Sequence, residues 1–148
     1  MNTSRDISVL NSLIETTLDS MKGFADAAED SNGAHTAFFR EMAAERSACA
    51  SQLQARVTAL AGDPEEHSSY TAAAHRGFMN LRQALTGSDE RAIIEEVERG
   101  EDYIKGQYEA TLQDADLTPE TRQAIEQAYT SVRKGHDRAS ALKHQMAG

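Results

Sequence analysis

Cysteine is nearly absent from this sequence, and several other residue types that mark particular protein classes are scarce. Cys49 is the only cysteine, so no disulfide can form within the chain, which fits a reducing compartment. Tryptophan is missing, and aromatic residues make up only 5% of the chain. No apolar run approaches transmembrane length, and residues 1–6 lack the basic and then apolar pattern of a signal peptide. These absences predict a soluble cytoplasmic protein.

Positive charge is also in short supply. The chain has 15 basic residues against 24 acidic ones, which gives a formal net charge of −9. Binding to nucleic acid or to an anionic membrane surface needs a basic face, so neither is predicted as a partner.

The residues that are abundant favour helices. Ala, Glu, Gln, Arg and Leu dominate, there are two prolines, and the apolar fraction of 39% is enough for a helical core. A length of 148 residues suits one domain, so residues 1–148 are predicted to form a single all-α domain.

Apolar residues recur at helical spacing in four long segments and one short one. Breaks such as Ser31-Asn32-Gly33, Ala61-Gly62-Asp63-Pro64 and Thr86-Gly87-Ser88-Asp89 separate them. Thr118-Pro119 provides a cap and a first-turn proline for the last helix. The expected helices cover about 6–30, 35–60, 69–85, 89–113 and 119 onward.

Short turns make successive helices antiparallel. The short helix over 69–85 takes one of these reversals, so the four long helices run up-down-down-up. That is the order of a ferritin-like four-helix bundle with one long crossover. The short helix over 69–85 is expected to pack along the outside of the bundle as a separate element.

Three polar side chains fall on the apolar stripes and are predicted to meet inside the bundle. Glu101 interrupts the stripe of the acidic helix, Arg46 lies in the seam of the second helix, and His136 faces inward from the last. A buried carboxylate needs a cation, a proton or a metal beside it. The first hypothesis is an ion pair of Arg46 with Glu101, helped by His136, which would fix the helix register. On the first helix, Glu15 and Asp19 fall on the opposite side from the core.

The alternative hypothesis is a site for iron or another divalent metal. Its candidate ligands are Glu45, Glu98, Glu101 and His136. Di-iron bundles use a Glu from each of two helices and a Glu-x-x-His from each of the other two, and this chain contains no Glu-x-x-His. Arg46 would also place a cation beside the metal. No cofactor and no catalytic residue is therefore expected under the first hypothesis.

A series of short segments runs in order along nearly the whole chain. They are Leu10-Asn11-Ser12-Leu13-Ile14-Glu15, Gly23-Phe24, Ala44-Glu45-Arg46, Gly62-Asp63-Pro64, His75-Arg76-Gly77-Phe78, Glu98-Arg99-Gly100-Glu101-Asp102 and His136-Asp137. On these segments the chain resembles the bacterial ferritin-like four-helix-bundle proteins classed as a domain of unknown function. The resemblance implies a ferritin-like fold and, through ferritins and rubrerythrins, gives some support to a metal site. It implies no reaction.

Two functions follow as hypotheses. The first is a non-catalytic structural or interaction protein, for example in a stress response, that forms a homo-oligomer or binds another protein. The second is an iron-binding protein of the ferritin or rubrerythrin type, with an oxidase or storage role.

Overall fold

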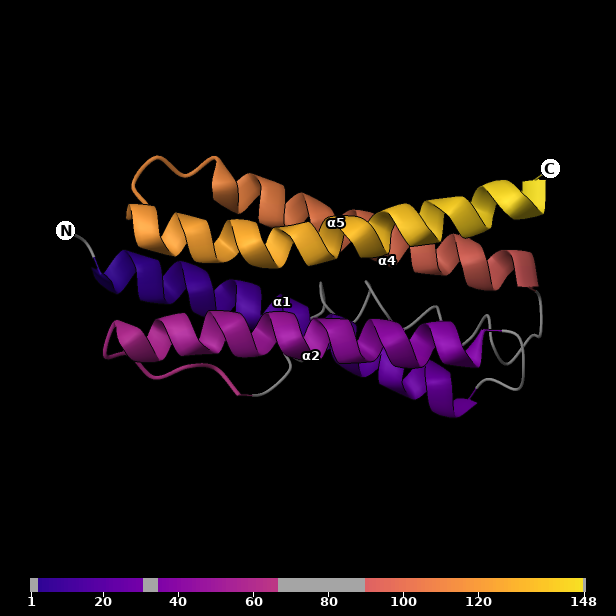
Figure 1. Cartoon of the computed structure of the whole chain (residues 1–148), viewed down its shortest axis with the longest axis horizontal. Coiled ribbons are helices and arrows are strands. Elements are labelled where there is room, and N and C mark those ends of the chain that lie inside the picture. Colours follow the sequence, from indigo (N-terminus) through magenta and orange to yellow (C-terminus); the bar gives the residue numbers. More distant parts are fainter. Residues whose placement is uncertain (1–2, 31–34, 67–89, 148) are drawn as a thin grey trace.

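The structure of the protein is a computed structural model, which describes residues 3–30, 35–66 and 90–147. Within these ranges the secondary structure is entirely helical, which confirms the all-α prediction (Figure 1). The predicted helix over 69–85 lies outside the described residues. No helix in the described ranges combines the length and apolar character needed to cross a membrane. The four helices are α1 (Thr3–Asp30), α2 (Thr36–Ala59), α4 (Glu90–Leu112) and α5 (Pro119–Ala147).

The helix ends follow the local sequence closely. Helix α5 begins at Pro119, directly after Thr118, because proline's fixed φ suits the first turn and its missing N–H is not needed there. After α2, Ala61 rather than Gly62 takes the left-handed conformation, with a φ of 62°. Gly62 has a different role, because a β-carbon there would lie 2.8 Å from Ile7 Cδ1. Glycine thus lets the end of α2 approach the first helix.

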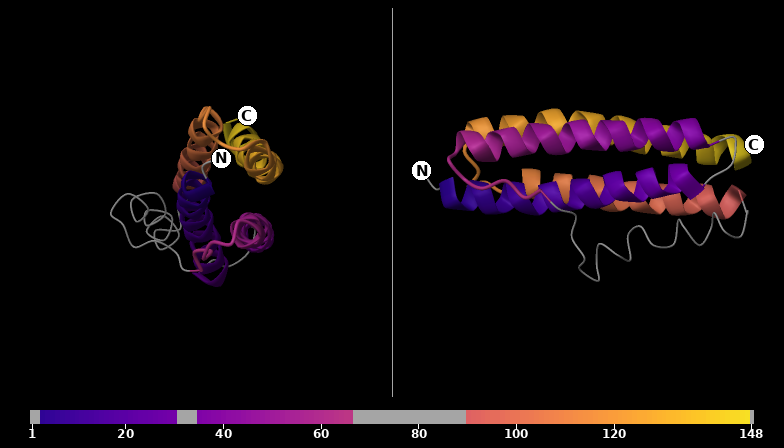
Figure 2. Two further views of the ribbon diagram at one scale, coloured as in Figure 1. Left: turned by 90° about the vertical axis from the view of Figure 1, so that its left-hand side faces the viewer. Right: turned by 90° about the horizontal axis from the view of Figure 1, so that it is seen from below.

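The four helices lie side by side along their length. Helices α1 and α5 run in one direction, and α2 and α4 run in the other (Figure 1). Viewed end-on, they occupy four corners, with α1 diagonal to α5 and α2 diagonal to α4 (Figure 2). The packed pairs agree with this view: α1 with α2, α4 with α5, α2 with α5, and α1 with α4. Each helix therefore turns one face toward a shared interior.

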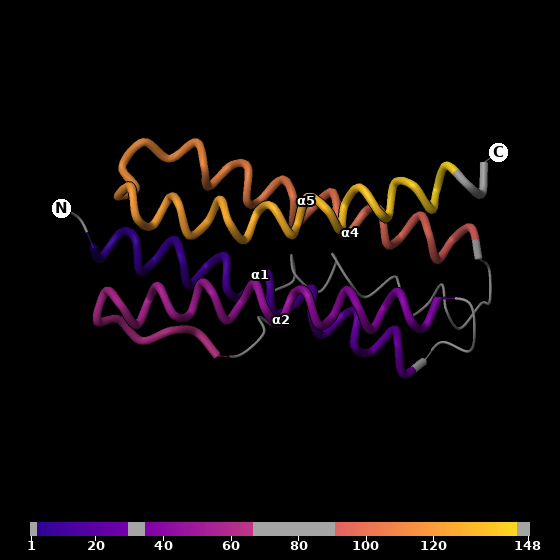
Figure 3. Tube along the Cα trace, in the orientation of Figure 1, coloured from indigo at the N-terminus to yellow at the C-terminus, as the bar shows by residue number. Residues whose placement is uncertain are grey.

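Polar contacts fasten the end of the molecule where α1 begins. The buried carboxylate of Asp6 accepts hydrogen bonds from the Thr118 hydroxyl at 2.5 Å and the Thr121 hydroxyl at 2.8 Å. After α2 the chain turns back over residues 60–66 (Figure 3). The Asn11 side chain of α1 holds this segment, because its Nδ2 donates to Asp63 O and its Oδ1 accepts from Glu65 N. These bonds fix the relative heights of α1, α2 and α5.

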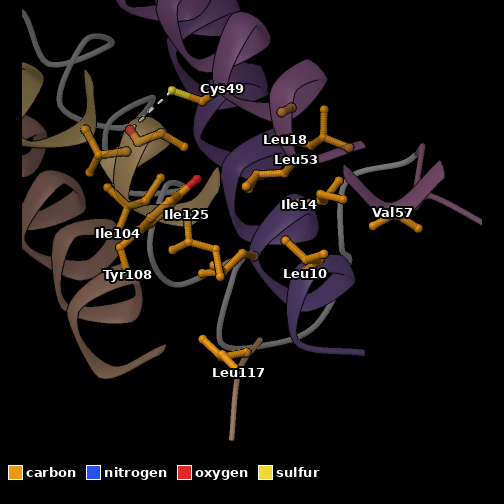
Figure 4. Packing of buried hydrophobic residues seen from close by; sticks show 14 residues of the cluster. Leu10, Ile14, Leu18, Cys49, Leu53, Val57, Ile104, Tyr108, Leu117 and Ile125 are labelled. Atoms are coloured by element: carbon orange, nitrogen blue, oxygen red, sulfur yellow. Dashed lines mark hydrogen bonds between the residues drawn. The ribbon is translucent and has the colours of Figure 1, made fainter. Parts of the chain in front are cut away.

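The interior consists of two apolar clusters placed one after the other along the helices. The larger cluster fills the end near residues 117 and 57 (Figure 4). Its buried members are Leu10, Leu13, Ile14, Leu18, Cys49, Ala50, Leu53, Val57, Ile104, Tyr108, Leu117, Ile125, Ala128 and Val132. The smaller cluster lies toward the opposite end. Its buried members are Phe24, Ala27, Phe39, Met42, Ile93, Val97 and Ala139.

Candidate functional site

A buried ion pair stands between α2 and α4. Arg46 Nη2 donates to both carboxylate oxygens of Glu101, at 2.7 Å to Oε1 and 2.5 Å to Oε2. The Arg46 side chain is 1% exposed and the Glu101 side chain is fully buried. Each of them continues the apolar stripe of its helix, so the helical period itself brings the two charges into the interior.

The ion pair separates the two apolar clusters. On α2, Arg46 follows Met42 of the smaller cluster and precedes Cys49 of the larger one, and Glu101 occupies the equivalent place on α4 between Val97 and Ile104. The same interval holds Ser20 on α1 and His136 on α5. We call Ser20, Arg46, Glu101 and His136, one residue from each helix, the polar layer.

Burial and charge oppose each other at Glu101. Burial raises the pKa of the Glu101 carboxyl, whereas the Arg46 guanidinium and, more weakly, His136 act to lower it. The net direction is upward, because removing a carboxylate from water costs more than one partner returns. Only one nitrogen of the guanidinium contacts the carboxylate, so this is not the two-pronged pairing that stabilises such pairs best.

Room for the guanidinium comes from Gly135 on α5. A β-carbon at this position would lie 2.6 Å from Arg46 Nη2 and 2.7 Å from Met42 Cε. Real β-carbons do not approach other atoms this closely, so the two side chains would have to move. Since Arg46 is held by Glu101, any such movement disturbs the ion pair.

We expect Gly135→Ala to lower the free energy of unfolding by about 1–2 kcal/mol, because overpacking outweighs the gain in helix propensity. Gly106→Ala on α4 is the matched control. No atom lies within 4 Å of a β-carbon there, so that change should stabilise the protein by about 1 kcal/mol. Urea unfolding of both variants measures the contrast, and stabilisation by Gly135→Ala would show that the layer can repack freely.

His136 forms the outer edge of the polar layer. Its side chain is 17% exposed, and Nε2 forms a 2.6 Å hydrogen bond with Asp102 Oδ1. The predicted help of His136 to the ion pair is indirect: its Nε2 bonds Asp102, and His136 acts on Glu101 only by lowering the pKa of that carboxyl. A helical wheel cannot resolve this difference, because Glu101 and Asp102 are adjacent and His136 can reach either.

The remaining carboxylates of the proposed metal site are engaged elsewhere. Glu98 accepts a 2.9 Å hydrogen bond from Lys143 Nζ, and Glu45 lies 3.6 Å from Arg138 Nη1. Across the ranges that the structure describes, no three His, Cys, Asp or Glu residues gather into a group able to hold a metal. With Arg46 already beside Glu101, the residues present do not fit a di-metal centre.

Burial keeps two potentially reactive groups of the described core in their neutral forms. The Cys49 thiol, 2% exposed, donates to Ala128 O at 3.6 Å (Figure 4), and burial raises its pKa. A neutral thiol is a poor nucleophile. The Tyr108 hydroxyl lies 2.7 Å from Thr17 Oγ1, and burial raises its pKa as well. Both groups belong to the packed core.

The structure of three positions is not predicted by the sequence analysis. Ser20 is fully buried, Asp19 is 7% exposed although its wheel position predicts solvent, and Gly135 borders Arg46. The burial of Ser20 could have been predicted from the sequence. It lies seven residues after Leu13 and seven before Ala27, so all three share the buried face of α1. The burial of Asp19 could not be predicted in this way. A helical wheel shows which side of a helix faces the bundle core, but it does not show whether the opposite side is also covered.

Residues 5–114 match the sequence profile of a family described as a Domain of unknown function (DUF2383). The matched range includes α1, α2 and α4, and therefore both partners of the buried ion pair, and it ends before α5. No curated protein matches the chain.

Proposed function

Since the chain belongs to the domain of unknown function family DUF2383, whose description assigns no activity, we propose a function from the structure itself: a non-catalytic helical scaffold. The fold we propose is a ferritin-like four-helix bundle of the up-down-down-up kind. The helix directions and the packing of neighbours at four corners support this arrangement (Figures 1 and 2).

The observation that carries the proposal is the Arg46–Glu101 ion pair. In a di-metal bundle the central level of the interior holds carboxylates and histidines around two cations. Here a guanidinium takes the place of a metal cation and supplies the positive charge that Glu101 requires. We therefore infer that the level of the bundle that holds the metals in a ferritin relative holds an ion pair in this chain. This ion pair fixes the register of α2 relative to α4.

A scaffold without an internal site acts through its outer surface. We propose that the chain assembles with itself or with another helical protein, because its net charge of −9 disfavours nucleic acid and anionic membranes. We expect sedimentation of the full chain at increasing concentration to show self-association. If the chain stays monomeric at all concentrations, self-association is excluded and the partner is a different protein. Crosslinking in the native cell would then identify it.

Iron loading tests the proposal against the oxidase or storage alternative. The protein is purified without chelator, loaded anaerobically with ferrous iron, desalted and then exposed to oxygen. We expect no tightly held iron and no rapid oxidation, because Arg46 repels a cation at this level.

About two retained irons per chain, as a di-metal centre would hold, with fast oxidation that disappears in Glu101→Ala, would overturn the scaffold proposal. Glu98→Ala serves as a second variant, because Glu98 is 19% exposed and belongs to neither apolar cluster. Exposed Glu126 provides the control for nonspecific binding, since Glu126→Ala removes the same charge far from the polar layer.

A further inference from the structure

Three buried atoms of the polar layer have no hydrogen-bond partner within the described part of the protein. They are Ser20 Oγ, Arg46 Nη1 and His136 Nδ1, on α1, α2 and α5 respectively. His136 Nδ1 lies 3.7 Å from Asp137 Oδ1, which is too far for a hydrogen bond. Buried polar atoms are almost always satisfied by protein or by ordered water, so three such atoms at one level require an explanation.

Several contacts place these atoms around one region. The Arg46 guanidinium contacts α5 at Gly135, the neighbour of His136. It also lies 6.0 Å from the ring of Phe24, one helical turn beyond Ser20 on α1. The charge of His136 acts on Glu101, the partner of Arg46. All four helices therefore bring polar groups to the boundary between the two apolar clusters.

We propose that the polar layer binds internal water, held by Arg46 Nη1 and Ser20 Oγ and extending toward His136 Nδ1. The ligand must be an acceptor, because Nη1 can only donate hydrogen bonds. It must also be neutral, because Glu101 already balances the charge of Arg46. It must be small, because the Arg46 side chain is only 1% exposed and the space beside its Nη2 would not admit even a β-carbon at Gly135.

Water meets all of these requirements, since it accepts from Arg46 and can both donate to and accept from a serine hydroxyl. At His136, Nε2 faces the Asp102 carboxylate and Nδ1 is left for the water. Water can bond Nδ1 whether or not this nitrogen carries a proton, because water both donates and accepts. A buried water typically makes two to four hydrogen bonds, and the layer offers that number of partners. The polar layer that separates the two apolar clusters is thus hydrated.

Magnetic relaxation dispersion of water in a solution of the full chain counts long-lived internal waters. We expect the double variant Arg46→Met/Glu101→Leu, which makes the layer apolar, to lose at least one of them. Ser20→Ala, which removes one partner and leaves the ion pair in place, should shorten the residence time of the water or abolish its signal.

The control is Thr17→Val combined with Tyr108→Phe. These two buried hydroxyls lie one turn from the layer and bond each other, so their joint removal creates no unpaired group and should leave the count unchanged. A count unchanged in the double variant and in Ser20→Ala would overturn the proposal. So would a high-resolution crystal structure with a protein group on Arg46 Nη1, or with an anomalous halide peak there after a bromide soak.

Discussion

Replacing Arg46 by Met or Glu101 by Leu is expected to lower the free energy of unfolding by about 3–5 kcal/mol, because each change leaves the opposite charge buried without a partner. The double change removes both charges and replaces them with apolar side chains of similar volume. Its cost should be far smaller than the sum and close to zero. Urea unfolding of the three variants completes a double-mutant cycle, and the expected coupling is most of the single-variant loss.

The surface pair Glu98–Lys143 provides the matched control. It also joins two helices, with a 2.9 Å contact, but half of the Lys143 side chain is exposed. Glu98→Gln and Lys143→Met should each cost less than about 1 kcal/mol. If the losses at Arg46 and Glu101 simply add, the two residues do not stabilise each other, and the ion pair is not what fixes the register of α2 and α4.

A near-neutral double variant would raise the question of why the ion pair is present. Two apolar clusters joined without interruption would let α2 slide against α4 by a helical turn at little cost, since both sides would be uniformly apolar. A charge pair is satisfied only in one register. For a proposed scaffold, whose outer surface depends on the relative heights of its helices, such specificity matters more than added stability.

The sequence predicted the ion pair because both residues occupy stripe positions and because glycine and proline set the helix ends accurately. The prediction that they meet also requires the two residues to lie at one height along the bundle. Heights alone do not give the rotation of each helix about its axis. They therefore do not predict that the His136 ring turns to Asp102, one residue beyond Glu101.

The space around the charges was harder to foresee than the charges themselves. Gly106 and Gly135 are both glycines inside a helix, yet nothing lies near a β-carbon at Gly106, whereas one at Gly135 would clash with Arg46. No local signal distinguishes the two, because both follow a lysine and interrupt a helix. Only the packing of α2 against α5 decides which glycine is needed, and that is a property of the assembled core.

The second large effect is a pH dependence that Arg46→Met should acquire. Burial already raises the pKa of Glu101 above its ordinary value of 4.5, and removing the guanidinium removes the main influence that lowers it. The folded variant then holds the Glu101 proton more tightly than the unfolded chain does. The tighter binding of this proton adds to the free energy of unfolding of the variant. That contribution is fully present below about pH 4.5 and is lost as the pH rises through the folded-state pKa of Glu101.

The free energy of unfolding of Arg46→Met should therefore fall as the pH rises above about 4.5, with a slope of up to about 1.4 kcal/mol per pH unit for one proton. Glu101→Leu should show no such added slope, because the stranded arginine stays charged throughout this range. Urea unfolding at several pH values measures both variants relative to wild type.

The decisive control is Arg46→Met/Glu101→Gln, which keeps the shape of the carboxyl but cannot ionise. His136 and Glu45, the other charged groups that act on Glu101, are unchanged in every variant, so differences between the variants isolate Glu101. The added slope should disappear in this double variant. If it persists, the proton comes from another group, and Glu101 is not the carboxylate that Arg46 neutralises. If Arg46→Met is equally destabilised at every pH, water reaches Glu101 and screens it, and the core at this level is more open than the buried ion pair indicates.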